Sequence, residues 1–363
     1  MKVSEICDLI NGRAFKPEDW DTTGLPIVRI QNLNNESAPF NYFSGEYSLS
    51  HEIDNGELLF SWSGTPGTSF GAFRWYRGKA ILNQHIYKVL PKIDVDKDYL
   101  LYALNGNISR IISRAHGGVG LQHITKKELN EIAIRIVPRE EQSKIIKVLN
   151  QLQHVLTSRR AQLAKLDELV KCRFVELFGD PVTNPKSWQL EKLADLGELA
   201  RGISKYRPRN APVLLNGPYP LIQTGDISKA ETYITDYTSS YSEEGLKQSK
   251  LWPSGTLVIT IAANIAETSI LTFPACFPDS VVGFIAKENR VSSLFIHYWF
   301  TFFQQKLEHD APQVAQKNIN LKILSELLVI VPPMEVQLSF TTFVSRIDKL
   351  RFFGKAEIIY GNE

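Results

Sequence analysis

The longest regular pattern of hydrophobic positions lies near the middle of the chain, in residues 139–178. Hydrophobic residues recur there at alternating steps of four and three, without proline or glycine. The positions are Ile145, Leu149, Leu152, Leu156, Leu163, Leu166, Val170 and Leu177, with Arg159 and Arg173 as interruptions. A 3.5-residue repeat is typical of a coiled-coil helix. We therefore predict a helix about 60 Å long, with an amphipathic helix packed on a globular core as the alternative.

The stretch GDPVTNPKSW, residues 179–188, predicts an abrupt end to this helix. Gly179 is placed to form a left-handed cap, and Pro181 cannot continue a helix. Residues 182–185 should form a turn, with Asn184 held extended by the proline that follows it. A strand-like stretch comes next, so the chain stops a helix and begins a new structural unit.

Segments on the two sides of this stop resemble one another. The pairs are PIVRIQNL (26–33) with PLIQTGDI (220–227), GELLFSWSG (56–64) with GTLVITIAA (255–263), and residues 118–142 with residues 313–337. In the last pair Pro138 aligns with Pro333 and Gln142 with Gln337. The conserved order and nearly constant offset indicate a tandem duplication with a period near 195 residues. So long a period predicts two domains and not a solenoid.

Each copy has the same expected plan, which makes the fold class α+β. Short strands with Gly, Pro and Asn turns come first, followed by a helix, a loop, a short helix, a strand ending in proline, and a coiled-coil helix. We expect two mixed α/β domains, at 1–138 and 181–332, a central helix at 139–180 and a distal helix at 333–363. Two heptad helices in one chain suggest an antiparallel coiled coil.

The distal helix is expected to be short. Phe340, Val344 and Ile347 begin a seam, but Arg351 stands where the central helix has Leu156, and Gly354 follows. About 20 residues of helix, or about 30 Å, are therefore expected.

Composition limits the functional classes. The 363 residues are 43% hydrophobic and 22% charged, with a formal net charge of +2. Without a strong basic excess, any interaction with DNA must depend on local clusters. The three cysteines are far apart, which argues against a disulfide framework or a zinc site. No signal segment or membrane-length apolar run is evident, so a cytoplasmic location is expected.

Motifs for catalysis are not found. HGGVG (116–120) lacks the βαβ setting of a nucleotide-binding fingerprint, and no GxxxxGK[ST] occurs. Asp279 and Glu288 faintly resemble a nuclease carboxylate set, but the lysine is missing. The seven histidines show no metal-ligand spacing. We expect no catalytic residue, cofactor or metal.

The tandem plan, the junction ELFGDPVTNPKSWQLEKLADL (176–196) and the helix start PREEQ (138–142) resemble the specificity subunit of type I DNA restriction–modification systems. The resemblance implies that each repeat is a target recognition domain reading one half of a split, asymmetric DNA site. It implies that the helices space the halves and dock two methyltransferase subunits, that motor–nuclease subunits join this core, and that the subunit has no catalytic centre. The short distal helix departs from the family, so a truncated or silent subunit is one alternative. A coiled-coil scaffold that does not read DNA is another.

Candidate DNA contacts lie in segments that differ between the repeats, such as 61–79 and 260–277. Arginine suits guanine edges, Gln and Asn suit adenine edges, and small residues let backbone approach DNA. In the first domain the candidates are Ser63, Gly64, Thr65, Gly67, Thr68, Arg74, Tyr76, Arg77, Lys79, Gln122 and His123. In the second they are Arg201, Lys205, Tyr206, Arg207, Arg209, Asn264, Gln316, Lys317 and Asn318. Solvated hairpins, helix capping and charged surface loops are the non-functional alternatives.

Overall fold

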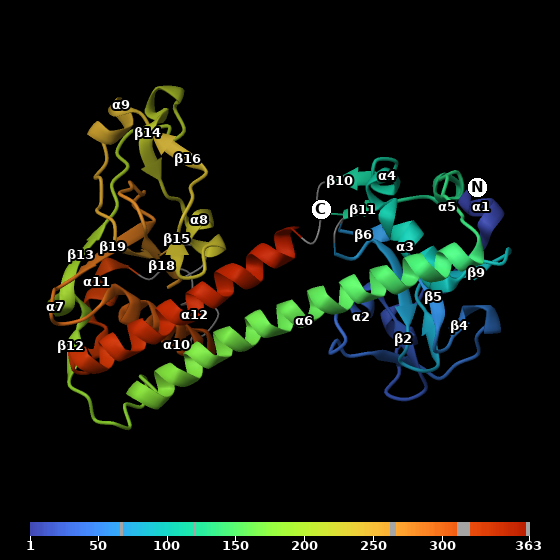
Figure 1. Cartoon of the computed structure of the whole chain (residues 1–363), viewed down its shortest axis with the longest axis horizontal. Coiled ribbons are helices and arrows are strands. Elements are labelled where there is room, and N and C mark those ends of the chain that lie inside the picture. Colours follow the sequence, from blue (N-terminus) through green and yellow to red (C-terminus); the bar gives the residue numbers. More distant parts are fainter. Residues whose placement is uncertain (66–67, 119–120, 262–265, 311–319, 361–363) are drawn as a thin grey trace. The chain divides into compact units, whose positions relative to one another are not determined.

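The computed structural model describes residues 1–65, 68–118, 121–261, 266–310 and 320–360. The chain forms two compact units, residues 1–155 and residues 156–363 (Figure 1). Helix α6, Arg139–Phe178, is a continuous helix of 40 residues, as the hydrophobic repeat predicts, and it contributes residues to both units. None of the helices in the described ranges combines the length and hydrophobicity that crossing a membrane requires.

The first unit consists of short strands and helices that precede α6. The strands are β1 (Cys7–Asn11), β2 (Leu25–Val28), β3 (Asn41–Phe43), β4 (Glu52–Ile53), β5 (Glu57–Ser61), β6 (Ser63–Gly64), β7 (Gly71–Trp75), β8 (Ala80–Leu82), β9 (Ile86–Pro91), β10 (His116–Gly118) and β11 (Leu121–His123). The helices are α1 (Val3–Ile6), α2 (Ile30–Asn34), α3 (Lys97–Gly106), α4 (Ile108–Ile112) and α5 (Lys126–Asn130), with 3₁₀ turns at Pro17–Asp19 and Leu49–His51. A core of buried residues from β1, β5, β9, α3 and α5 holds the unit together.

The second unit follows the end of α6. Its strands are β12 (Leu190–Lys192), β13 (Gly197–Arg201), β14 (Leu215–Leu221), β15 (Tyr233–Ile234), β16 (Ser239–Tyr241), β17 (Leu257–Thr260), β18 (Thr268–Leu271), β19 (Val281–Ala286) and β20 (Leu328–Ile330). Its helices are α7 (Leu193–Leu196), α8 (Thr224–Lys229), α9 (Glu243–Lys247), α10 (Ser293–Asp310), α11 (Leu321–Glu326) and α12 (Met334–Tyr360), with a 3₁₀ turn at Pro212–Leu214.

The main sheets of the two units share one topology. The strand order is β1-β9-β5-β7 in the first unit and β13-β19-β17-β18 in the second, where β15 adds a further, parallel strand. The three corresponding strand pairs are antiparallel in both sheets. The turns before β5 and β17 use Gly56 and Gly255, with φ of +80° and +84°, a conformation that glycine adopts without strain. The shared topology confirms that the two domains are tandem copies of one frame.

A buried glutamine joins each frame to its long helix. Gln142 accepts a hydrogen bond from the Asp96 amide at 2.8 Å and donates to the Val137 carbonyl at 2.7 Å. Gln337 accepts from the Ser292 amide at 3.1 Å and donates to the carbonyls of Arg290 and Pro332 at 3.0 and 2.9 Å. Both side chains are almost fully buried. The aligned glutamines of the repeat thus tie the start of α3 to α6 and the start of α10 to α12.

The GDPVTNPKSW stretch ends α6 by satisfying its last carbonyls. Gly179 has φ of +76° and donates to the Val175 carbonyl, as predicted for a left-handed cap. The Lys186 ammonium donates to the Glu176 and Leu177 carbonyls at 2.6 and 3.0 Å. The Trp188 indole donates to the Phe178 carbonyl at 2.9 Å. These contacts account for Gly, Lys and Trp at this spacing.

The prediction of an extended Asn184 is wrong, because its φ is +48°. The side-chain oxygen of Asn184 accepts a hydrogen bond from the backbone N–H of Trp188 at 2.9 Å, and its side-chain nitrogen donates to the Trp188 backbone carbonyl at 2.8 Å. This two-way hydrogen bond stabilises a turn that outweighs the local preference of a residue before proline.

Helix α12 lies antiparallel against the C-terminal half of α6 within the second unit (Figure 1). The antiparallel direction follows from which residues meet. Phe340, near the start of α12, packs on Phe174 and Phe178 at the end of α6, whereas Arg351, later in α12, pairs with the earlier Asp167 at 2.6 Å. The predicted seam residues Phe340, Val344 and Ile347 are buried, as are Leu156 and Val170 of α6. Phe174 and Phe178, which the heptad pattern omitted, are fully buried because this end of α6 packs on a globular core at steps of four.

The predicted length of the distal helix is also wrong. Helix α12 has 27 residues and continues through Gly354 to Tyr360, although it is shorter than α6. A Cβ on Gly354 would lie 3.2 Å from Leu163 Cδ2, so glycine here allows close contact with α6. Arg351 fits the buried seam because Asp167 and Asp348 neutralise it at 2.6 and 2.8 Å.

Candidate nucleic-acid interface

Two groups of first-domain candidates lie on one small sheet. Strand β6 pairs with β11, placing Gln122 opposite Gly64 and His123 opposite Ser63. Strand β10 completes this three-stranded sheet. The sequence could not indicate this contact, because the paired segments are about 60 residues apart. The structure therefore places Ser63 and Gly64 beside Gln122 and His123 on one sheet.

The loop that begins at Gly64 has a backbone conformation that requires glycine at its first position. Gly64 has φ of +142°, and a Cβ there would lie 2.2 Å from Ser69 Oγ. Ser69 Oγ in turn accepts from the Thr65 amide at 2.7 Å, and Thr68 Oγ1 donates to the Thr65 carbonyl at 3.2 Å. Only glycine fits this position without displacing the loop. Gly67 lies outside the described residues.

Electrostatics on the β10–β11 side involve two histidines and one carboxylate. His116 Nε2 lies 2.6 Å from Glu128 Oε1, and the His116 and His123 rings lie 6.0 Å apart. Hydrogen bonds from Thr125 first, and from His116 second, lower the pKa of Glu128 to about 2. Glu128 therefore stays ionised and anchors His116. The Gln122 Oε1 atom is buried and has no hydrogen-bond partner within the described ranges.

The first-domain arginines are already bound within the protein. Arg74 is largely buried and contacts the Gly56 carbonyl at 2.5 Å and Asp98 at 2.9 Å. Arg77 donates to the carbonyls of Asn32 and Glu36. The Arg77 guanidinium also stacks on two rings, with distances of 4.7 Å to the Trp75 centroid and 4.8 Å to that of Phe40. Both arginines brace strands and loops of the domain.

Two other candidates in this segment are more accessible. Lys79 is 63% exposed on its side chain, 3.2 Å from Glu52. Tyr76 is 62% exposed, with its hydroxyl 3.3 Å from Arg74 Nε. A phenol and an ammonium in these positions can reach a phosphate or a base without breaking the fold.

Three arginines of the basic segment 201–209 in the second domain lie around Asp279, which the sequence did not suggest as an arginine partner. Arg209 makes two hydrogen bonds to the Asp279 carboxylate at 2.6 and 2.9 Å, and Arg207 lies 3.9 Å from it. Arg201 Nε donates to the Asp279 backbone carbonyl at 2.9 Å. The sequence suggests for Asp279 only a faint resemblance to a nuclease carboxylate set. In the structure it binds arginines.

The backbone of this basic segment is held independently of Asp279. The Gln248 side-chain carbonyl accepts from the amides of Lys205 and Tyr206 at 2.7 and 3.1 Å. Ser249 Oγ donates to the Ile203 carbonyl at 2.9 Å. Lys205 and Tyr206 themselves are exposed at the surface. Asn264, Gln316, Lys317 and Asn318 lie outside the described residues.

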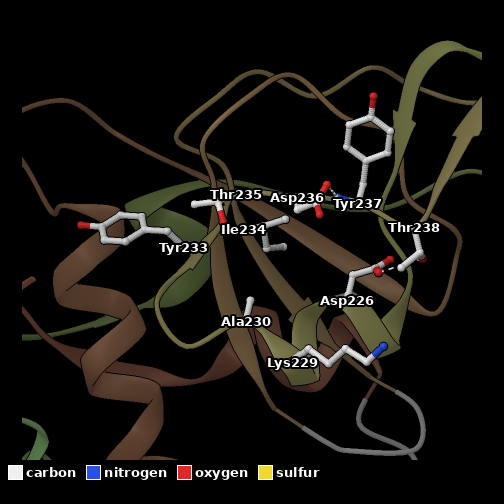
Figure 2. Close-up of a pocket in the computed structure, with 9 residues that line it drawn as sticks. All are labelled: Asp226, Lys229, Ala230, Tyr233, Ile234, Thr235, Asp236, Tyr237 and Thr238. Atoms are coloured by element: carbon white, nitrogen blue, oxygen red, sulfur yellow. Dashed lines mark hydrogen bonds between the residues drawn. The ribbon is translucent and has the colours of Figure 1, made fainter. Parts of the chain in front are cut away.

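A surface pocket of about 210 Å³ opens beside α8 and β15 in the second unit (Figure 2). Its lining includes Asp226, Lys229 and the segment 233–238. Asp226 is occupied, because its carboxylate accepts from Thr238 Oγ1 at 2.9 Å and from the Gln223 amide at 2.8 Å. The pocket contains no candidate from the sequence. Of its two carboxylates, Asp226 caps the start of α8 and Asp236 accepts a hydrogen bond from the Tyr237 amide at 2.8 Å. Within the described ranges no His, Cys, Asp and Glu cluster of three or more is placed to hold a metal ion.

Comparison with known proteins gives one consistent result. A family model described as the type I restriction modification DNA specificity domain matches residues 1–168 and 185–355. The chain is 24% identical to the type I restriction enzyme EcoBI specificity subunit of Escherichia coli, over 96% of this chain and 78% of that one. It is 22% identical to the MjaVIII specificity subunit of Methanocaldococcus jannaschii, over 92% and 87%.

A solved structure agrees on the fold. The S subunit of a type I restriction–modification system from M. genitalium superposes with a TM-score of 0.57 at 15% identity, covering 100% of this chain and 92% of that one. The family match spans both units and nearly the whole chain. The chain therefore belongs to the family of type I restriction–modification DNA specificity domains, as its repeat and its FGDPVTNPKSW junction predicted.

Proposed function

We propose that this chain is the sequence-recognition subunit of a type I restriction–modification complex and that each unit reads one half of a bipartite, asymmetric DNA site. The observation that carries this proposal is the pair of frames with one strand order and one glutamine contact to a long helix. On this shared frame the candidate surfaces differ. The first unit presents a β6–β11 sheet with Gly64 and Gln122, whereas the second presents arginines around Asp279. Different surfaces on equal frames suit two different half-sites.

Helix α6 is proposed to set the spacing between the half-sites. Its 40 residues correspond to about 60 Å, or about 18 base pairs at 3.4 Å each. A helix without glycine or proline keeps its length, whereas a flexible linker of equal residue number does not. The proposed domain limits remain 1–138 and 181–332, with α6 and α12 as the segments that dock two methyltransferase subunits.

Apolar side chains on α6 support the docking role. Val148, Leu152 and Val155 are 62%, 39% and 52% exposed and are spaced by four and three residues. This spacing places them on one stripe of the helix. The motor–nuclease subunits would join through this assembly, and the chain itself is proposed to be non-catalytic.

The decisive experiment is co-purification of the chain with its neighbouring methyltransferase subunit, followed by mapping of methylated bases. A split site with two unlike halves is expected. Methylation that ignores sequence would contradict the recognition role and favour a scaffold, and methyl transfer by the chain alone would contradict its non-catalytic role.

A further inference from the structure

Asp279 is surrounded by arginines that a DNA-reading domain would be expected to present to DNA. Arg209 binds both of its carboxylate oxygens, Arg207 lies 3.9 Å away, and Arg201 holds its backbone carbonyl. Two guanidinium groups thus contact this one carboxylate, and Arg201 and Lys205 add two further positive charges to the same segment. The cluster is thus an anion-binding site that already contains an anion from its own chain.

The carboxylate and the arginines are held in different ways. Asp279 lies two residues before the start of β19, whose Val282 pairs with Arg201 of β13, so the sheet fixes the position of this part of the cluster. Arg207 and Arg209 belong to the surface segment that Gln248 secures through backbone amides. Removing the carboxylate therefore leaves both the sheet and the loop with their own hydrogen bonds.

The ion pair is open to solvent. The side chains of Arg207, Arg209 and Asp279 are 56%, 47% and 39% exposed. Exposed ion pairs contribute little to stability, so another anion can compete for the guanidinium groups. A guanidinium binds carboxylate and phosphate oxygens through the same two-pronged geometry, and a DNA phosphate also releases counterions when it is neutralised.

We propose that Asp279 occupies, in the free protein, the position of a DNA backbone phosphate, and that Arg207 and Arg209 exchange the carboxylate for a phosphate when DNA binds. This inference rests on the proposed function and refines it. It makes these two arginines phosphate contacts, so sequence reading in this unit belongs to other residues. It also makes Asp279 a built-in competitor that lowers affinity for any DNA.

The test compares Asp279→Asn with the wild type, each as the full chain assembled with its methyltransferase subunit. Binding is measured by fluorescence anisotropy on a duplex containing the mapped methylation site and on a duplex with that site scrambled. Asn keeps the size of the side chain and removes the charge. We expect affinity to rise about 3- to 10-fold for both duplexes, because competition is removed for phosphates of any sequence.

Two controls separate this effect from general charge. Asp195→Asn, at an exposed position on α7, removes the same charge from the same unit and should change affinity less than twofold. In an Arg207→Ala/Arg209→Ala background the gain from Asp279→Asn should disappear. Size-exclusion chromatography of each variant checks that the complex remains assembled.

Several outcomes would overturn the inference. These are a gain no larger than that of Asp195→Asn, a loss of affinity, a change confined to one duplex, and a gain that persists without Arg207 and Arg209. Failure of the proposed function looks different, because the wild-type complex itself would then bind the two duplexes equally well. The two failures are therefore distinguishable in one set of titrations.

Discussion

Replacing Gln337 by Ala should destabilise the second unit strongly. The side chain is fully buried and makes three hydrogen bonds, to the Ser292 amide and to the carbonyls of Arg290 and Pro332. Alanine leaves one donor and two acceptors unpaired, in a space that the truncated side chain no longer fills. Each unpaired buried group costs about 1–3 kcal/mol, and the effects of neighbours are not additive. We expect a total loss of about 3–5 kcal/mol.

The matching change in the first unit should cost less. Gln142 makes two such hydrogen bonds, to the Asp96 amide and the Val137 carbonyl, so Gln142→Ala should cost about 2–4 kcal/mol. Gln151→Ala, at an exposed position on α6, is the control and should stay within about 0.5 kcal/mol of the wild type. The order of the three variants follows from the number of buried partners each one loses.

A single melting curve does not suit a protein of two units, because its unfolding need not be two-state. Hydrogen exchange measured by mass spectrometry reports on each unit separately. Gln337→Ala should speed exchange at the first turn of α10, and Gln142→Ala at the first turn of α3. If Gln337→Ala exchanges like Gln151→Ala, the glutamine contacts do not hold the frames to their helices, and the reasoning is refuted.

Three further predictions follow from other parts of the structure. Gly64→Ala should lower recognition of one half-site at least 10-fold, because its Cβ would meet Ser69 Oγ at 2.2 Å; methylation on a half-site library checks this. Burial lowers the pKa of His297 to about 4, below the ordinary 6.5, so the second unit should lose up to about 3 kcal/mol of stability as the pH falls from 6.5 to 4. Urea titrations followed by hydrogen exchange in the second unit measure this loss, which His297→Gln should remove, and an equal loss in both proteins contradicts the prediction. Seven residues inserted after Val155 should lengthen the preferred spacer by about two to four base pairs, since a heptad adds about 10.5 Å; methylation of a spacer library showing an unchanged preference would assign the spacing to partner subunits.

Much of the framework could be predicted because it depends on patterns within short segments. The end of α6 followed from Gly179 and Pro181, and the burial of Phe340 and Val344 followed from the seam. The conformation of Asn184 could not be predicted from the sequence. Its side chain hydrogen-bonds to the backbone of Trp188, and no local preference encodes that contact. Local rules fail where a specific hydrogen bond outweighs them.

The candidate DNA-binding surface was harder to predict, because the sequence does not show which groups an arginine side chain contacts in the folded protein. Arg77 has a side chain suited to reading guanine, yet it binds backbone carbonyls more than 40 residues away in the chain. For Asp279 the sequence suggests a nuclease-like carboxylate, whereas its contacts with Arg201 and Arg209 form only when residues 201–209 fold beside the start of β19. Gly64 and Gln122 were each proposed separately, and only strand pairing shows that they share a sheet.

The balance of charge fits a protein that must prefer one sequence over all others. Phosphate contacts raise affinity for DNA of every sequence. A recognition subunit with many free arginines therefore gains affinity for non-target DNA together with its target. Here the net charge is only +2, and Arg74, Arg77 and Arg209 are held by partners inside the protein. Those contacts keep general attraction low. Under the proposed function, the exposed Tyr76 and Tyr206, which carry no charge, would add contacts to DNA with less general attraction to phosphate than an arginine brings, and discrimination would depend on the fit of each unit to its proposed half-site.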